Sequence, residues 1–140
     1  MSKINKFNTA GYSDPTAYEA LTRVEQELHA SRFRPIVYIC SPFSGDTETN
    51  LENTRRYSRF AVEQGYLPIA PHLMFPQFLD DSVPAERDLA MRMNIILLTK
   101  CAELWAFGDR ISKGMSIEIT RARRKGQPVR VFTDQCEEVT

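Results

Sequence analysis

The chain has 140 residues, a length that predicts one domain with a core large enough to need no disulfide bonds. Its 18 basic and 18 acidic residues cancel, so the overall charge does not favour a nucleic-acid or membrane partner. The three cysteines form no C-x-x-C pair and the two histidines form no metal-binding motif, so we expect reduced thiols, no metal and no cofactor. The N-terminus lacks an apolar signal core and the apolar runs are too short to cross a bilayer, so we expect a cytoplasmic protein.

The residues before the first predicted strand form an arm and one helix. Residues 1–12 show no periodicity, and we expect a loosely held arm. The Ser-Asp-Pro sequence at residues 13–15 is typical of a helix start, and apolar residues then recur at helical spacing to about residue 31. We expect this segment, residues 13–34, to pack on the following α/β domain of residues 35–140, with packing on a partner subunit as the alternative.

The first predicted strand ends in a polar loop. Residues 35–40 form a continuous apolar run, which is typical of a central parallel strand. The turn-rich loop after it contains Ser44 and Gly45, and residues 50–64 are predicted to form a helix. Arg55 lies about one turn into this helix, where its planar guanidinium would reach a phosphate at the loop. The alternative for this arginine is a solvated side chain.

A long connection follows the second predicted strand, residues 66–70. Residues 71–81 combine two prolines, two phenylalanines and His72, a composition that we interpret as a lid over an aromatic base. Alternatively, the two phenylalanines cover the edge of the core, and His72 is a loop histidine whose ring is already hydrogen-bonded.

The next predicted helix starts at Pro84, with Asp81 or Ser82 near its cap. Its second half, residues 91–98, is apolar nearly all round. Asn94 should therefore be buried, and it needs a hydrogen-bond partner from the backbone or from a ligand.

The segment after the predicted strand at residues 102–107 carries the residue types best suited to chemistry. Ser112 and Gly114 form a turn where this strand passes into a helix, and unpaired N–H groups at a helix start attract phosphate or carboxylate. Glu118 lies on the apolar stripe of that helix and is not explained by its cap, because the capping-box position holds Met115. An acid in this place is either a buried structural carboxylate or a catalytic one.

A last strand is predicted at residues 129–132, after a helix end rich in arginine and lysine that complements the helix dipole. The acidic tail beyond this strand is expected to be frayed. Strands and helices alternate along the chain, which predicts an α/β fold with a parallel sheet and helices on both faces. The sequence contains neither a Walker A motif nor a G-x-G-x-x-G motif.

Three segments of the chain carry a resemblance to a known family. They are Val37–Gly45, the Pro71-His72 pair, and the run from Leu104 that leads into Ser112 and Glu118. With these residues the chain resembles the nucleoside 2-deoxyribosyltransferase superfamily, most closely its uncharacterised DUF4406 branch. It is also similar to the deoxynucleoside monophosphate N-glycosidases. The resemblance covers about residues 35 to 132 and implies a Rossmann-like, flavodoxin-like fold.

The resemblance also implies roles for individual residues. Glu118 is implied as the nucleophile that attacks the sugar of an N-glycosidic bond, with Tyr38 beside it. Many members carry an aspartate that meets the leaving base, and this chain has Asn94 there, which can hydrogen-bond a base but cannot protonate it. Help for the leaving group would then come from His72, Asp80, Asp81 or Asp88. The residues expected to contact the substrate and its 5′-phosphate are Ser41, Phe43, Ser44, Gly45, Arg55, His72, Ser112 and Gly114.

Three functions stay open at this point. The first is an enzyme that hydrolyses or transfers the N-glycosidic bond of a nucleoside 5′-monophosphate or a nucleoside. Serine at position 112, where the transferases often have aspartate, favours phosphorylated substrates and water. The second is a nucleotide-binding protein that has lost the chemistry, which Asn94 favours, and the third is a structural or phage-regulatory protein. Because relatives in this superfamily are oligomers, we also expect a homodimer or a larger homo-oligomer.

Overall fold

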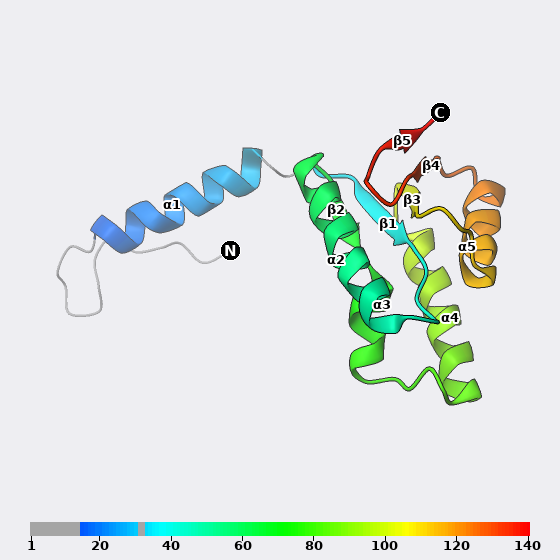
Figure 1. The fold of residues 1–140 in the computed structure, drawn as a ribbon. Helices are drawn as coiled ribbons and strands as arrows, with labels where there is room; N and C mark the ends of the chain where they lie inside the picture. Colours follow the sequence, from blue (N-terminus) through cyan, green and yellow to red (C-terminus); the bar gives the residue numbers. More distant parts are fainter. Residues whose placement is uncertain (1–14, 31–32) are drawn as a thin grey trace. The chain divides into compact units, whose positions relative to one another are not determined.

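A computed structural model gives the structure of residues 15–30 and 33–140. The expected N-terminal arm and the predicted cap at residues 13–14 lie outside the described residues. The chain divides into two units, residues 1–34 and residues 35–140. The first unit contains helix α1, Pro15–Ala30, and the second contains the sheet and the remaining helices (Figure 1).

The second unit is built on one five-stranded sheet. Its strands are β1 (Ile36–Cys40), β2 (Leu67–Ile69), β3 (Glu103–Phe107), β4 (Val129–Phe132) and β5 (Glu138–Val139). They lie in the order β2-β1-β3-β4-β5, and the first four are parallel to one another. The predicted α/β fold with a parallel sheet is therefore confirmed, and the strand order is the flavodoxin-like one.

The prediction of a frayed C-terminal tail is wrong. Strand β5 pairs antiparallel with β4, and the tail turns back onto the sheet through a hydrogen bond from Thr133 N to the carbonyl of Glu137 at 2.8 Å. The Arg130 guanidinium holds Glu138 with two bonds, at 2.7 and 2.9 Å. The acidic tail thus contacts the sheet through backbone pairing and through an ion pair with a strand arginine.

Five helical segments connect the strands. They are α2 (Thr47–Glu63), α3 (Pro71–Met74), the 3-10 helix η1 (Phe75–Gln77), α4 (Pro84–Thr99) and α5 (Lys113–Arg124). The predicted loop after the second strand therefore contains two short helical turns. Helix α2 begins before the predicted residue 50 because Asp46 caps it, accepting a bond from Thr49 N at 3.3 Å. The N-cap of helix α4 is Val83, which forms no side-chain cap, and the expected Ser82 directly precedes it.

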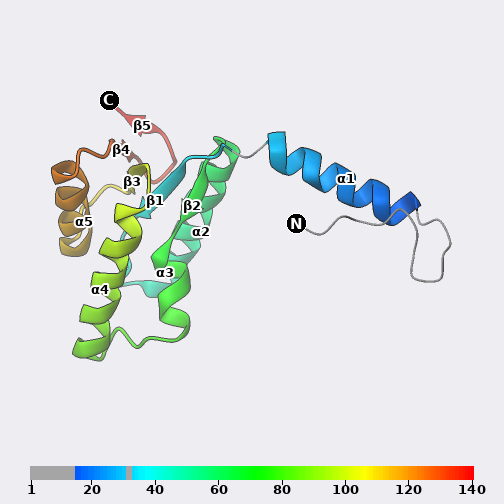
Figure 2. The same cartoon turned by 180° about the vertical axis from the view of Figure 1, so that it is seen from behind.

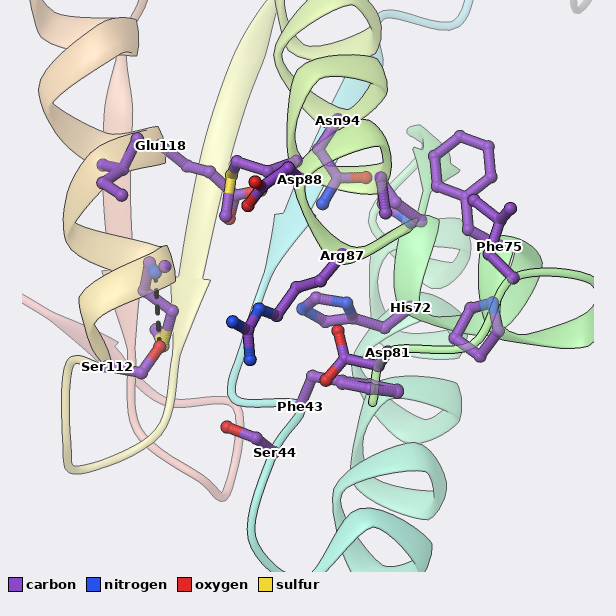
Figure 3. Close-up of a pocket in the computed structure, with 18 of the residues that line it drawn as sticks. Phe43, Ser44, His72, Phe75, Asp81, Arg87, Asp88, Asn94, Ser112 and Glu118 are labelled. Carbon is purple, nitrogen blue, oxygen red and sulfur yellow. Dashed lines mark hydrogen bonds between the residues drawn. The ribbon is translucent and has the colours of Figure 1, made fainter. Parts of the chain in front are cut away.

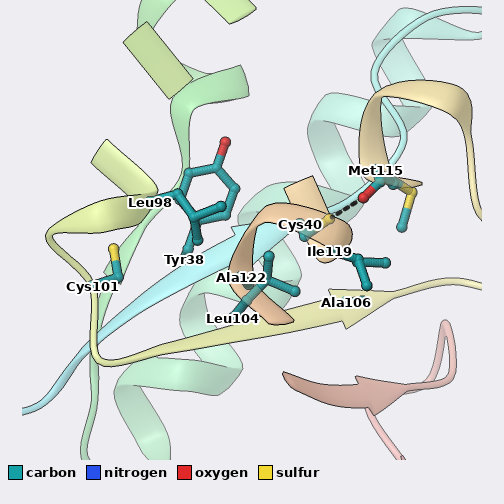
Figure 4. Packing of buried hydrophobic residues seen from close by; sticks show 9 residues of the cluster. All are labelled: Tyr38, Cys40, Leu98, Cys101, Leu104, Ala106, Met115, Ile119 and Ala122. Atoms are coloured by element: carbon teal, nitrogen blue, oxygen red, sulfur yellow. Dashed lines mark hydrogen bonds between the residues drawn. The ribbon is translucent and has the colours of Figure 1, made fainter. Parts of the chain in front are cut away.

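Successive strand residues point to opposite faces of the sheet, which creates two buried layers. Tyr38 and Cys40 point to the face that α4 and α5 cover, where they pack with Leu98, Met115 and other apolar residues of these helices (Figure 4). Val37 and Ile39, also on β1, point to the face covered by α2. Figure 2 shows α4 and α5 together on one side of the sheet, with α2 on the other.

The strand order determines where a ligand can enter. The chain leaves β1 toward one edge of the sheet, to β2, and leaves β3 toward the other edge, to β4. The loops after β1 and β3 therefore diverge and open a crevice at the carboxyl ends of these two neighbouring strands. The Ser44 loop and the Ser112 turn both lie at this crevice.

Trp105 on β3 is fully buried in the layer against α2, where its ring contacts those of Phe60, Tyr66 and Phe132. We expect Trp105→Ala to lower the free energy of unfolding by about 3–5 kcal/mol because it leaves a large cavity in this layer. Urea unfolding followed by circular dichroism measures the loss. The control Phe33→Ala, at a side chain that is 88% exposed, should change stability by less than about 0.5 kcal/mol. A Trp105→Ala loss as small as the control's would contradict the packing described here.

Candidate active site

A cavity of about 490 Å³ lies at the carboxyl ends of β1 and β3. Its walls come from the loop after β1, from α3 and η1, from α4, and from the start of α5 (Figure 3). The structure brings eight of the predicted site residues to this cavity: Ser41, Phe43, Ser44, His72, Asn94, Ser112, Gly114 and Glu118.

The start of α5 presents Glu118 to the cavity. Ser112 is the N-cap, as the sequence indicates, and its hydroxyl accepts a bond from Met115 N at 3.2 Å. Glu118 follows on the apolar face of the helix together with Met115, Ile119 and Ala122, and is only 2% exposed. The carboxylate that the sequence placed on an apolar stripe is therefore buried, with one side toward the cavity.

Three donor side chains surround the Glu118 carboxylate. The Tyr38 hydroxyl donates to Oε2, and the Cys40 thiol lies 3.5 Å from Oε1. The Asn94 amide from α4 is the third, and it lowers the pKa of the carboxyl. Tyr38 and Cys40 are two residues apart on β1 and thus point to the same face of the sheet, which is why both reach this acid.

The environment of Glu118 sets its protonation. Burial raises the pKa of the Glu118 carboxyl from 4.5 to about 7, while the bonds from Tyr38, Cys40 and Asn94 act in the opposite direction. Burial and the adjacent carboxylate raise the pKa values of the Tyr38 hydroxyl and the Cys40 thiol well above their usual range. Both groups therefore remain protonated near neutral pH and act as donors.

Asn94 is buried, as its apolar helix predicts, and only half of its amide is satisfied. It is 5% exposed and lines the cavity. Its nitrogen is directed at Glu118, whereas its Oδ1 has no hydrogen-bond partner among the described residues. A buried acceptor without a partner is uncommon in native proteins and indicates a place for a ligand or a water.

Hydrogen bonds between the loop after β1 and the first turns of α2 fix the conformation of this loop. The Ser41 and Thr54 hydroxyls lie 2.9 Å apart, and the Asn50 amide donates to the carbonyls of Phe43 and Ser44 at 3.0 and 3.1 Å. Gly45 has φ of 98°, a value that a side chain would disfavour. These contacts hold Phe43 and Ser44 at the mouth of the cavity.

His72 lies on the opposite wall from α5. Its Nε2 is 3.0 Å from the Ser41 carbonyl oxygen, and its ring centroid is 5.0 Å from that of Phe43. Burial lowers the pKa of the His72 imidazole, so the ring is neutral near pH 7. Because a carbonyl only accepts, Nε2 carries the proton and Nδ1 is an acceptor.

Three of the expected site residues are not among those that line the cavity. Tyr38 is not on the cavity wall, and its hydroxyl donates to Glu118, which is. Gly45 and Arg55 are exposed and are absent from the cavity walls. The structure instead contributes two cations that the sequence reasoning missed, Arg87 and Lys113. Arg87 precedes Asn94 by two helical turns, so the helical period marks it as a residue of the same face.

The residues expected to assist the leaving base also divide into those that line the cavity and one that does not. Asp81 and Asp88 line the cavity, together with His72. Asp80 does not, and its carboxylate accepts bonds from the Ser82 amide and hydroxyl at 2.9 and 2.6 Å. These bonds lower the pKa of the Asp80 carboxyl, so the group stays ionised and remains bonded to Ser82 within the same turn.

Within residues 15–30 and 33–140, no group of three or more histidine, cysteine, aspartate or glutamate side chains is arranged to hold a metal ion. In the same residues, no helix has both the length and the apolar character that a membrane span requires.

Comparisons with known proteins agree with this fold. Residues 35–132 match the family DUF7768, a domain of unknown function. A 2-deoxyribosyltransferase from the psychrotolerant bacterium Bacillus psychrosaccharolyticus superposes with a TM-score of 0.60 over 75% of this chain and 77% of that one, at 16% sequence identity. At this identity the likeness shows a shared fold. No curated protein matches the chain. The expected DUF4406 branch is not tested by these matches and stays a prediction.

The raised pKa of Glu118 has a consequence for stability. The folded state binds this proton more tightly than the unfolded state, so the free energy of unfolding falls as pH rises from 4.5 to about 7. Above that range we expect Glu118→Gln to be more stable than the unchanged protein by on the order of 3 kcal/mol, from the difference between 4.5 and about 7 at about 1.36 kcal/mol per pKa unit.

Urea unfolding of both proteins at pH 8 and at pH 4.5 measures this difference, which should vanish at the lower pH. Glu52→Gln, at an exposed carboxylate of α2, is the control and should leave stability unchanged at both values. A Glu118→Gln variant that is less stable at pH 8 would contradict the burial of an ionised carboxylate at this position.

Proposed function

Because the chain belongs to the DUF7768 family, whose function is unknown, and has the fold of a 2-deoxyribosyltransferase, we propose that it cleaves an N-glycosidic bond. The substrate is a nucleoside 5′-monophosphate or a nucleoside, and the sugar passes to water or to a second base. One observation carries the proposal. A buried carboxylate, Glu118, forms part of the wall of a cavity of about 490 Å³ and is held there by Tyr38, Cys40 and Asn94.

The chemistry follows that of a retaining glycosidase. The ionised Glu118 oxygen attacks the anomeric carbon as the bond to the base breaks, and the base leaves with the bonding electrons. The product of this step is a sugar ester of Glu118. Water or a second base then attacks the same carbon and restores the carboxylate, and water loses its proton to solvent or to a neighbouring base.

The three donors around Glu118 serve this reaction in a specific way. Without them, burial would raise the pKa of the carboxyl further, and less of the nucleophile would be ionised near pH 7. Tyr38 and Cys40 are fully buried, so their bonds also restrict the rotamer of the acid. An oriented nucleophile loses less entropy when it reaches the transition state.

The mouth of the cavity suits an anionic group on the substrate. The Ser112 cap and Gly114 lie at the N-terminus of α5, where unpaired amides favour negative charge, and Ser44 of the β1 loop lines the same cavity. Arg87 and Lys113 line the same cavity, and we assign to them the phosphate contact that the resemblance gives to Arg55, which is exposed and outside it.

A nucleotide-binding protein without catalysis is the second candidate. Asn94 favours it, because an amide cannot protonate the leaving base as an aspartic acid would. Asp81, Asp88 and His72 are the remaining proton donors on the cavity wall. His72 is the weakest of them, since its one proton is bonded to the Ser41 carbonyl.

Release of free base separates the two candidates. We expect the protein to release base from at least one member of a panel of ribo- and deoxyribonucleoside 5′-monophosphates and nucleosides, followed by liquid chromatography. Glu118→Gln should lower the rate by about 10³-fold or more, because the amide is not a nucleophile. Glu52→Gln should retain full activity. If thermal stability rises with a nucleotide but no base is released, the binding-only candidate is correct.

The dependence of kcat/KM on pH tests the role of Tyr38. Because the ionised carboxylate is the active form, kcat/KM should rise about tenfold per pH unit below pH 7 and level off above it. Tyr38→Phe removes a bond that lowers the pKa of Glu118, so its midpoint should move to higher pH and its plateau should fall. An unchanged midpoint in Tyr38→Phe would show that the hydroxyl does not act on the nucleophile.

A further inference from the structure

We infer that the cavity selects a base that carries an exocyclic amino group, because two polar side chains on its walls, Asn94 and His72, present hydrogen-bond acceptors. The inference rests on the proposed function, since it assumes that a nucleotide or nucleoside occupies the cavity with its sugar at Glu118. It concerns which bases are accepted: adenine and cytosine over their oxo counterparts, hypoxanthine and uracil.

The first acceptor is Oδ1 of Asn94. In its ionised, reactive form Glu118 has only acceptor atoms, so the Asn94 atom directed at it is the amide nitrogen. The oxygen is then directed away from Glu118, and Figure 3 shows it on the side of the cavity that carries Phe75. The oxygen is buried and has no partner among the described residues, and Asn94 itself is one of the residues that line the cavity. Only a donor from a ligand or a water can satisfy it.

The second acceptor is Nδ1 of His72. The Ser41 carbonyl, 3.0 Å from Nε2, requires the proton on that nitrogen. The imidazole is neutral and its second nitrogen has a free lone pair. Both polar groups are thus oriented by partners that belong to the protein, Glu118 for Asn94 and Ser41 for His72. While Glu118 is ionised, neither can reverse its role without losing its partner inside the fold.

The position of these acceptors points to the base rather than to the sugar. In Figure 3, Glu118 and Ser112 lie on the α5 side of the cavity, and Phe43, His72 and Phe75 lie on the opposite side, with Asn94 on α4 between them. Aromatic rings suit the flat face of a base. With the sugar at Glu118, the base extends along Asn94 toward His72, and its polar edge meets the two acceptors.

Replacing the amino group of the base by an oxo group turns a hydrogen-bond donor into an acceptor at this contact. The amino group of adenine or cytosine donates two protons, whereas the oxygen at the same position of hypoxanthine or uracil only accepts. The oxo base would leave Asn94 Oδ1 buried and unpaired against a second acceptor. Sites built around a hydrogen bond reject analogues that lack the matching group by large factors, and we expect a preference of about tenfold or more.

Calorimetric titration of the unchanged protein tests the inference through binding, independently of turnover. The ligands are the 5′-monophosphates of adenosine, inosine, cytidine and uridine, together with their 2′-deoxy forms. We expect Kd for each amino base to be at least about tenfold lower than Kd for its oxo counterpart in both sugar series. Release of base from the same ligands is measured separately. Selective binding without base release would contradict the proposed catalysis and would still support the inferred base preference.

Two variants assign the preference to its residues. Asn94→Leu keeps the approximate volume without the acceptor, and His72→Phe keeps a ring beside Phe43 without Nδ1. Each should bring the amino-to-oxo ratio toward one, and His72→Phe keeps the test open if Asn94→Leu does not fold. Equal affinities for amino and oxo bases, a preference that follows only the 2′-hydroxyl, or a ratio that survives in both variants would overturn the inference.

Discussion

The hydrogen bond between the Tyr38 hydroxyl and the Glu118 carboxylate is the contact on which this site depends. It joins strand β1 to helix α5 across 80 residues of chain, inside a layer of apolar side chains. A carboxylate in such a layer carries a large desolvation cost, and donors reduce that cost only when the fold brings them close. Cys40 and Asn94 complete the set, so strand β1, helix α4 and helix α5 all converge on one acid.

The surroundings of Glu118 explain how the energetic cost of burying a carboxylate leads to a chemically useful pKa. Burial alone would keep Glu118 protonated at neutral pH, and full exposure would make it an ordinary, mobile carboxylate. The balance between burial and three donors brings its pKa to about 7, where it is both ionised in part and poorly solvated. A carboxylate of this kind is a better nucleophile than one covered by water. The same balance predicts that the site costs stability, as active sites often do.

Much of this site follows from local patterns in the sequence. The position of Glu118 on an apolar helical stripe predicts its burial, the position of Ser112 predicts its cap, and the apolar surroundings of Asn94 predict a buried amide. The alternation of strands and helices predicts the parallel sheet. The pairing of Tyr38 with Glu118 came from the resemblance to a known superfamily, because spacing along the chain does not reveal contacts between distant elements.

What escaped prediction depends on strand order and on tertiary charge pairing. Cys40 meets Glu118 only because β1 lies beside β3 and presents every second residue to α5, which no local pattern specifies. Strand β5 depends on the pairing of Glu138 with Arg130, and the composition of the tail indicated disorder instead. Arg55, expected at the phosphate from its place in a helix and from the resemblance, is exposed and does not line the cavity, whereas Arg87 on α4 does.

The most direct test of this account is the titration of Glu118 itself. Carbon-13 NMR of protein labelled at the glutamate side-chain carboxyls follows each acid with pH, and the resonance that disappears in Glu118→Gln identifies this one. The account predicts a midpoint near 7, well above the ordinary value of 4.5. A midpoint near 4.5 would mean that the carboxylate is solvated, and the buried nucleophile described here would not exist.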